Sequence, residues 1–308
     1  MTPLSWPGPN LRIAYGCALA VLIVGTLVTY YLARAHPERD YLELRMRVRT
    51  WWWIVPPLIV ALSIGPWAVA LLFALASGIA LREYLALGGI SRRPSLAVVL
   101  AYLAIPVQYG LACLGSEPLF AAAIPLSCLA LAMAVLFAGS SAGFLPSVGV
   151  LASGMILTLF SFSHIARLTT WSDGPGLVAF LLIVTQLNDV SQYVSGKRFG
   201  KTPLAPALSP SKTREGMIGG LVTSTLLGAV LGPLLTALTS LTAAAFAFAL
   251  ALAGVAGDLT ISAIKRDAGA KDSGTLLPGH GGLLDRMDSL IYAAPLFYYG
   301  LSVFHSRL

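Results

Sequence analysis

Long apolar runs separated by short polar segments dominate this chain of 308 residues. A helix that crosses a membrane needs about 20 consecutive, mostly apolar residues. The second and third apolar runs are short and meet at the sequence SIGPW, residues 63–67, where the Gly–Pro pair favours a break between two helices. The pattern predicts an all-α, polytopic integral membrane protein with about 9–10 transmembrane helices. The candidate spans are residues 11–33, 51–65, 66–86, 96–115, 118–138, 143–165, 175–195, 217–237, 241–264 and 289–305.

Composition and charge agree with this class. Hydrophobic residues make up 57% of the chain and charged residues only 11%, against roughly 25% in soluble domains. A net charge of +7 would suit nucleic acid in a soluble protein, but basic cytoplasmic loops explain it in a membrane protein, so we expect no nucleic-acid partner. Cys17, Cys113 and Cys128 lie in apolar runs without paired or metal-ligand spacing, which indicates buried small hydrophobic residues.

The distribution of Lys and Arg predicts the orientation of the spans. If the chain begins outside and then alternates, the segments 34–50, 82–95, 196–216 and 265–288 lie in the cytoplasm and hold 17 of the 20 basic residues. The first ten residues carry no basic charge and the first apolar run exceeds 20 residues, which argues against a cleaved signal peptide. We therefore expect the polar loops to face the cytoplasm.

The chain divides by polarity into two regions. Residues 1–170 form an N-terminal transmembrane region that is almost entirely apolar. Residues 171–308 form a C-terminal transmembrane region with the polar loops 196–216 and 265–288, and we expect this region to be catalytic.

Acidic residues inside apolar spans are costly and often functional. Asp189 and Asp258 are two such residues. On a helix, Asp258, Ser262 and Lys265 share one face, which is compatible with an internal Asp–Lys pair that locks two helices or with a metal or proton site. The sequence SPSKTREGMIGG, residues 209–220, places Lys212 and Arg214 before a new helix, where an anion could bind, although cytoplasmic loops are basic in any case.

The segment 265–288 concentrates charges and glycines. Asp285 and Asp288 are three residues apart in LDRMD, so a helix would turn both carboxylates to one side. Carboxylates without a cluster of thiols or histidines suit a hard cation such as Mg²⁺. The glycines of PGHGG would let a polyphosphate approach the backbone. His280 between them is either a hydrogen-bond donor to phosphate or an ordinary loop residue.

These residues together form a recognisable pattern. The sequence SAIKRDAGAKDSGTLLPGHGGLLDRMD, residues 262–288, resembles the signature of the CDP-diacylglycerol synthase (phosphatidate cytidylyltransferase) family at every fixed position. The Asn–Asp pair followed by GKRFGK, and the segment SPSKTREGMIGG, resemble two further family segments, so the resemblance covers roughly residues 180–300. One departure is Ile261, where family members often have Glu before the serine of the signature.

The resemblance implies that CTP and phosphatidate react at the bilayer surface to give CDP-diacylglycerol and pyrophosphate, as a step of phospholipid biosynthesis. It also implies a protein of the bacterial inner membrane with its active site in the cytoplasm, and a homodimer. Its metal would be Mg²⁺, alone or with a second cation, on Asp258, Asp285 and Asp288. The catalytic residues that it implies are Lys265, Arg266, Lys271, His280 and Arg286, and the substrate-binding residues are Asn188, Asp189, Ser209, Lys212, Thr213, Arg214, Gly281 and Gly282.

Three alternatives remain open at this point. An ion-coupled transporter would also place Asp189 and Asp258 within Gly- and Pro-interrupted spans. A lipid-binding scaffold could retain the fold without activity, although the intact acids and bases argue against it. A divergent paralogue that acts on a related phospholipid would explain Ile261.

Overall fold

The computed structural model describes residues 8–36, 41–90, 95–138, 143–276 and 281–305. His280 of the predicted catalytic set lies outside these residues. The helices are α1 Pro9–Ala35, α2 Leu42–Ile64, α3 Pro66–Leu87, α4 Leu96–Leu114, α5 Glu117–Phe137, α6 Phe144–Gly154, α7 Ser161–Leu168, α8 Gly174–Phe199, α9 Arg214–Leu235, α10 Ser240–Asp267, α11 Leu284–Met287 and α12 Leu290–His305. A π-helical turn, Met155–Phe160, joins α6 to α7, and the strands are β1 Pro203–Ala205 and β2 Ser209–Thr213.

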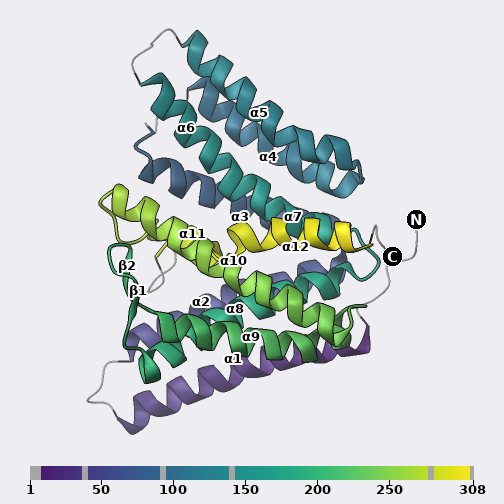
Figure 1. Cartoon of the computed structure of the whole chain (residues 1–308), viewed down its shortest axis with the longest axis vertical. Coiled ribbons are helices and arrows are strands. Elements are labelled where there is room, and N and C mark those ends of the chain that lie inside the picture. The colour runs from purple at the N-terminus through teal and green to yellow at the C-terminus, as the bar shows by residue number, and fades with distance from the viewer. Residues whose placement is uncertain (1–7, 37–40, 91–94, 139–142, 277–280, 306–308) are drawn as a thin grey trace.

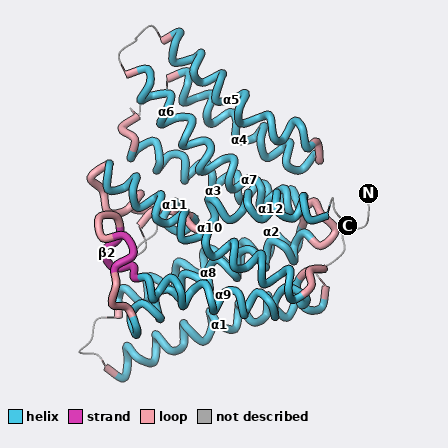
Figure 2. Tube along the Cα trace, in the orientation of Figure 1, coloured by secondary structure: helices cyan, strands magenta, loops and turns pink. Residues whose placement is uncertain are grey.

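The long helices run alternately in opposite directions (Figure 1). One end of the molecule carries the β1–β2 hairpin and the last turns of α3, α8 and α10, and we call it the loop end. The other end carries the start of α8 and the last turns of α12. In the part of the chain that the structure describes, strands occur only in the two-stranded hairpin (Figure 2).

The prediction of an all-α polytopic membrane protein is confirmed. Each of the ten predicted runs corresponds to a helical segment, and eight helices of the described residues are long and apolar enough to cross a membrane, rather than nine or ten. The other two are α2, whose first two turns are rich in charge, and α12, which has 16 residues. The predicted break at SIGPW lies at Gly65, whose φ of 133° suits glycine and ends α2 before Pro66 begins α3.

Small residues let α9 and α10 approach each other closely. A Cβ on Gly228 would lie 2.2 Å from Cβ of Ala247, and one on Gly232 would lie 2.0 Å from Cβ of Ala243. Helices in membranes associate through such close packing, because lipid gives no hydrophobic drive for their contact. Asn188 of α8 extends this packing, since its side chain donates to the carbonyl of Ala251 in α10 at 3.3 Å.

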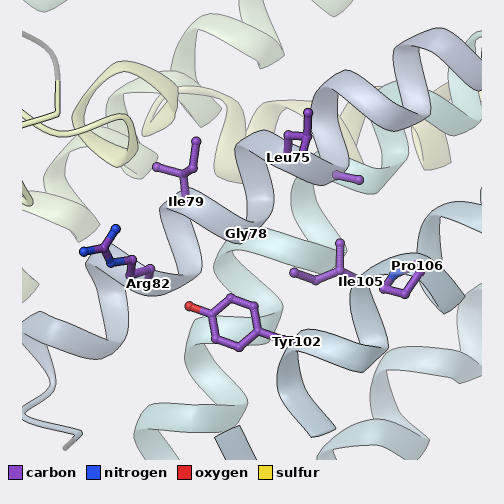
Figure 3. A pocket seen from close by; sticks show the side chains of 8 residues that line it. Leu75, Gly78, Ile79, Arg82, Tyr102, Ile105 and Pro106 are labelled. Atoms are coloured by element: carbon purple, nitrogen blue, oxygen red, sulfur yellow. The ribbon is translucent and has the colours of Figure 1, made fainter. Parts of the chain in front are cut away.

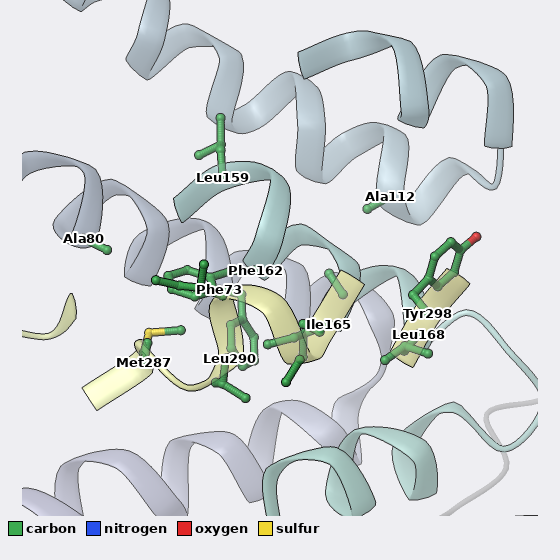
Figure 4. Packing of buried hydrophobic residues seen from close by; sticks show 14 of the residues in the cluster. Phe73, Ala80, Ala112, Leu159, Phe162, Ile165, Leu168, Met287, Leu290 and Tyr298 are labelled. Atoms are coloured by element: carbon green, nitrogen blue, oxygen red, sulfur yellow. The ribbon is translucent and has the colours of Figure 1, made fainter. Parts of the chain in front are cut away.

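A single cluster of buried apolar side chains connects the two halves of the chain. Phe73 of α3, Phe162 and Ile165 of α7, and Leu290 of α12 pack within it (Figure 4). The cluster therefore crosses the predicted region boundary at residues 170 and 171. The loop end of the C-terminal region rests on helices of the N-terminal region as a result.

The prediction of three buried cysteines is wrong for Cys17. Its side chain is exposed on α1, while Cys113 and Cys128 are half-buried. The outer face of α1 is apolar and contacts little protein, because an apolar surface in a membrane can face lipid instead of a protein core. Apolar surroundings in the sequence therefore did not imply burial by protein.

The charge bias makes the orientation testable. Ser211 in the hairpin and Ser172 before α8 are both exposed and lie at opposite ends of the molecule. In a chain whose three cysteines are replaced by alanine, we expect Ser211→Cys to react with a membrane-impermeant maleimide only from the cytoplasmic side, and Ser172→Cys only from the other side. Labelling of intact and permeabilised cells measures this. Reaction of Ser172→Cys from the cytoplasm would contradict the orientation.

Candidate active site

Three carboxylates from separate segments lie near enough to one another at the loop end to interact electrostatically. Asp189 lies in α8, Asp258 lies in α10, and Asp288 directly follows α11. Asp288 interacts electrostatically with both of the other two, and we call these residues the acidic cluster. A Cβ on Gly257 would lie 2.1 Å from the carbonyl oxygen of Asp288, so this glycine lets α10 pack directly against the backbone there. That contact brings Asp258 and Asp288 together.

The acidic cluster has few compensating partners. Lys212 of β2 donates to Oδ2 of Asp258, and Ser262 donates to Oδ1 of the same residue at 3.3 Å. Ser289 links the other two acids, because its hydroxyl donates to Asp189 at 2.8 Å and lies 3.4 Å from Oδ1 of Asp288. Lys212 and Arg286 both interact electrostatically with Asp189, and Lys212 also interacts with Asp288, so two cations compensate three acids.

Burial is the main reason why the pKa of Asp288 is raised well above its ordinary value. The neighbouring carboxylates of Asp258 and Asp189 raise this pKa further, and Lys212 opposes them only partly. The raised pKa means that the folded protein disfavours negative charge at Asp288 unless additional positive charge is nearby. A cation at this position would relieve the imbalance.

Asp285 belongs to a different arrangement. Lys265 donates to its Oδ1 at 2.5 Å, and the two side chains are only 13% and 4% exposed. Its Oδ2 accepts hydrogen bonds from the backbone N–H groups of Ser273 at 2.8 Å and Gly282 at 3.0 Å. Burial raises the pKa of Asp285, but Lys265 and these N–H groups outweigh it and hold the pKa below its usual value.

The expected common face of Asp285 and Asp288 is therefore not what the structure shows. The segment LDRMD is helical over only Leu284–Met287, and its two carboxylates have different partners. Lys265 likewise pairs with Asp285, while Asp258 pairs with Lys212, so both Asp–Lys pairs join separate segments. The predicted shared face of Asp258 and Ser262 is confirmed by their hydrogen bond.

The β1–β2 hairpin positions Lys212, and sequence reasoning had treated its residues as an irregular loop. Thr213 ends β2 and caps α9, because its hydroxyl accepts the N–H of Gly216 at 3.1 Å. Glu215 accepts the N–H groups of Lys201 and Thr202 at 3.0 and 3.1 Å and holds the start of the hairpin. These hydrogen bonds hold the hairpin in a position from which Lys212 reaches Asp258 of the acidic cluster.

The remaining predicted residues differ in their surroundings. Some support the structure: Asn188 is fully buried and bonds to α10, and Arg266 donates to the carbonyls of Leu208 and Ala270 at 3.3 and 3.2 Å. Others face solvent and could meet phosphate, and these are Lys271, Arg286 and Arg214. Ser209 is half-buried at the start of β2, and Gly281 has a φ of 79°, which favours glycine.

Two further residues bear on the site. Glu83 of α3 contacts the segment 273–284, and sequence reasoning missed it, although an acid within the apolar span 66–86 was a signal of the kind that drew attention to Asp258. Ile261 is completely buried among apolar residues, so the departure from the family signature places a methyl-bearing side chain in the core.

The acidic cluster suits a hard cation in its donor chemistry. Carboxylate oxygens are the preferred ligands of Mg²⁺, which also retains several waters. Among the described residues, no three Asp, Glu, His or Cys side chains are already gathered as a set of metal ligands. The ammonium group of Lys212 pairs with Asp258. It supplies there the positive charge that a bound metal ion would otherwise supply.

An apolar groove lies between α3 and α4. Its volume is about 360 Å³, and Arg82 and Tyr102 lie toward one end, with Leu75 and Pro106 toward the other (Figure 3). None of the acidic-cluster residues lines it. The reactive groups therefore lie outside this groove.

Comparison with known proteins identifies close relatives. The sequence model of the cytidylyltransferase family matches residues 45–304. The uncharacterized protein YnbB of Escherichia coli strain K12 is 42% identical over 286 residues, which cover 91% of this chain and 94% of that protein.

Enzymes with an assigned activity match a shorter part of the chain. A phosphatidate cytidylyltransferase of Mycobacterium leprae is 42% identical over 134 residues, 43% of each chain. One of Pseudomonas aeruginosa is 37% identical over 163 residues, 48% of this chain and 55% of the enzyme. The chain thus matches about half the length of these enzymes.

The Asp285–Lys265 pair predicts a specific effect on stability. We expect Asp285→Asn to lower the free energy of unfolding by about 3–5 kcal/mol, because it leaves a buried ammonium without its partner. Adding Lys265→Met should recover part of this loss, since no unpaired charge then remains. Thermal unfolding in detergent micelles measures both, with Asp267→Asn at an exposed acid as the matched control. Equal stability of Asp285→Asn and Asp267→Asn would contradict the assignment.

Proposed function

The chain belongs to the cytidylyltransferase family, and we propose that it transfers the cytidylyl group of CTP to phosphatidate, giving CDP-diacylglycerol and pyrophosphate. The names of the partial-length relatives support phosphatidate as the acceptor. Family membership favours a nucleotidyltransferase over an ion-coupled transporter or a scaffold. The observation that carries the proposal is the acidic cluster with exposed cations around it at one end of a membrane-spanning bundle.

The proposed reaction needs charge neutralisation more than proton transfer. A phosphate oxygen of phosphatidate attacks the α-phosphorus of CTP, the bond from this phosphorus to the oxygen that bridges to the β-phosphorus breaks, and pyrophosphate leaves. The attacking phosphate monoester is already ionised near neutral pH, so a general base has little to do. Two anions must meet, and the protein's task is to hold positive charge around them.

The exposed cations are suited to this task. Lys271, Arg286 and Arg214 face solvent at the loop end, and we assign them to the phosphate oxygens of CTP and of the lipid. Lys212 would join them if it moved from Asp258 when substrates bind. Lys265 and Arg266 have partners within the protein and hold the loop in place. His280 keeps its proposed role of orienting pyrophosphate.

Mg²⁺ is the proposed cofactor, alone or with a second cation. Asp258 and Asp288 would hold it together with Asp189, whereas Asp285 is occupied by Lys265 and backbone N–H groups. The bound ion would supply positive charge to the phosphates and stabilise the charge that develops on the leaving pyrophosphate. The burial of Asp288 beside Asp258 and Asp189, which raises the pKa of Asp288, supports this choice, because a bound cation would offset both effects.

The protein is an integral membrane protein, and we propose that it lies in the bacterial inner membrane with its loop end in the cytoplasm. CTP is a cytosolic nucleotide, and the basic segments lie at the end that carries the acidic cluster. A homodimer remains a prediction. The second candidate acceptor is a related phospholipid, for which the observation is Ile261 at a position where the family often has Glu.

An acceptor assay tests the proposed reaction. Purified protein in lipid nanodiscs should release pyrophosphate from CTP and Mg²⁺ when phosphatidate is present, and CDP-diacylglycerol should form in equal amount. Phosphatidylglycerol, whose phosphate is a diester rather than a monoester, is the matched control and should give no release. Release with another phosphomonoester lipid but not with phosphatidate would keep cytidylyl transfer and reject phosphatidate as the acceptor.

The metal assignment makes a separate prediction. Asp258→Asn and Asp288→Asn should each raise the Mg²⁺ concentration for half-maximal turnover by about tenfold or more, because loss of about 1.4 kcal/mol of binding corresponds to one decade. Asp288→Asn should not lower thermal stability, since it removes a buried charge that its neighbours already disfavour. Pyrophosphate release against Mg²⁺ concentration measures the shift.

The control for the metal prediction is Asp267→Asn, the same change at an exposed acid on the same helix as Asp258. It should leave the Mg²⁺ dependence unchanged. A shift in Asp285→Asn but not in Asp288→Asn would move the metal to Asp285. Unchanged Mg²⁺ dependence in all the acidic-cluster variants would reject the metal site.

A further inference from the structure

Glu83 of α3 is buried against the described parts of a loop segment, residues 273–276 and 281–284, which lie about 200 residues further along the chain. Its carboxylate is surrounded by donors from that segment. Oε2 accepts the hydroxyl of Ser273 at 3.0 Å and the N–H of Leu284 at 2.9 Å, and Oε1 accepts the N–H of Leu283 at 3.0 Å. The residue as a whole is 8% exposed.

The segment fits around this carboxylate closely. A Cβ on Gly282 would lie 2.1 Å from the hydroxyl of Ser273 and 2.4 Å from Oε2 of Glu83, and one on Gly274 would lie 2.8 Å from Oε1 of Glu83. Real Cβ atoms do not approach other atoms so closely, so both positions require glycine as long as Glu83 stays where it is. Glu83 therefore accounts for the glycine at 274, and Glu83 together with Ser273 accounts for the glycine at 282.

Glu83 is connected to the reactive groups through Ser273. The hydroxyl of Ser273 lies between Oε2 of Glu83 and Oδ2 of Asp285, at 3.0 and 2.9 Å, and its single proton can serve one of them at a time. The N–H groups that Glu83 accepts belong to the two residues immediately before Asp285. Glu83 thereby fixes the start of the short helix that carries Asp285 and leads to Asp288.

We propose that Glu83 is a positioning residue for cytidylyl transfer, which holds the segment 273–288 so that Asp288 and Arg286 face the substrates. This inference rests on the proposed function. In the proposed reaction, Glu83 contacts neither CTP nor the lipid. It acts through the backbone N–H groups of Leu283 and Leu284. The N-terminal region would then take part in catalysis by setting the geometry of a loop in the C-terminal region.

The test compares the same substitution at two hydrogen-bonded acids of the N-terminal region, Glu83, which is buried, and Glu117, which is half-buried. Glu83→Gln keeps the shape of the side chain but places an NH₂ group among N–H and O–H donors. Glu117→Gln is the matched control, because Glu117 accepts hydrogen bonds from Arg167 and Tyr298 at the opposite end of the molecule. Both variants lose a carboxylate that accepts several hydrogen bonds, so an effect of losing such a carboxylate in general should appear in both.

Hydrogen exchange reports the loop directly. In Glu83→Gln, amides in peptides that cover 273–288 should exchange at least tenfold faster, and those of Leu283 and Leu284 most of all, because their acceptor is lost. Glu117→Gln should leave exchange in this segment unchanged. Unchanged exchange in Glu83→Gln, or an equal rise in both variants, would overturn the inference.

Kinetics provide the second readout. Glu83→Gln should lower kcat by about a hundredfold, which is the effect of roughly 1 Å of misplacement, at a temperature where thermal unfolding shows that the variant is folded. Near-normal kcat in Glu83→Gln, or an equal loss in Glu117→Gln, would refute the positioning role. If the wild-type protein transfers no cytidylyl group, the proposed function fails, and hydrogen exchange still shows whether Glu83 holds the loop.

Discussion

Burial of charge at the loop end is the constraint on which the arrangement of this molecule depends. A carboxylate inside a helical bundle costs several kcal/mol unless cations or N–H donors compensate it. Asp285 has Lys265 and two backbone N–H groups, Glu83 has two N–H groups and a hydroxyl, and Asp258 has Lys212. Because these partners come from other segments, satisfying each carboxylate also fixes where two segments lie relative to each other.

Asp288 of the acidic cluster is compensated less completely than these carboxylates. Asp285 and Asp288 lie three residues apart, yet the first has a lowered pKa and the second a raised one. The difference comes from their surroundings, since Asp285 is paired with Lys265 while Asp288 is buried near two further acids. A fold that compensates one carboxylate so fully and leaves its neighbour short of positive charge indicates where an external cation would bind.

Local patterns in the sequence were sufficient for the helices and for the list of charged residues, but not for their partners. Apolar runs predicted every long helix, and the break at Gly65 followed from the Gly–Pro pair. The hairpin escaped prediction because its five-residue strand β2 is polar and basic, like an ordinary cytoplasmic loop. Glu83 and the separate roles of Asp285 and Asp288 depend on contacts between distant segments, which no spacing along the chain encodes.

The hydrogen bonds that tie a glycine-rich loop to α3 also affect how deep in the bilayer surface the proposed reaction would take place. A segment with Gly274, Gly281 and Gly282 has little conformational preference of its own, so its position must be imposed from outside. The central 18 residues of α3 are 50% buried in the bundle, the largest share among the eight candidate spans, which makes this helix a rigid support. In the proposed reaction, a lipid phosphate at the bilayer surface must meet a cytosolic nucleotide at one fixed level. Glu83 lies one turn from the end of α3 and ties the loop to that level, so the spanning helix itself determines where the two phosphates meet.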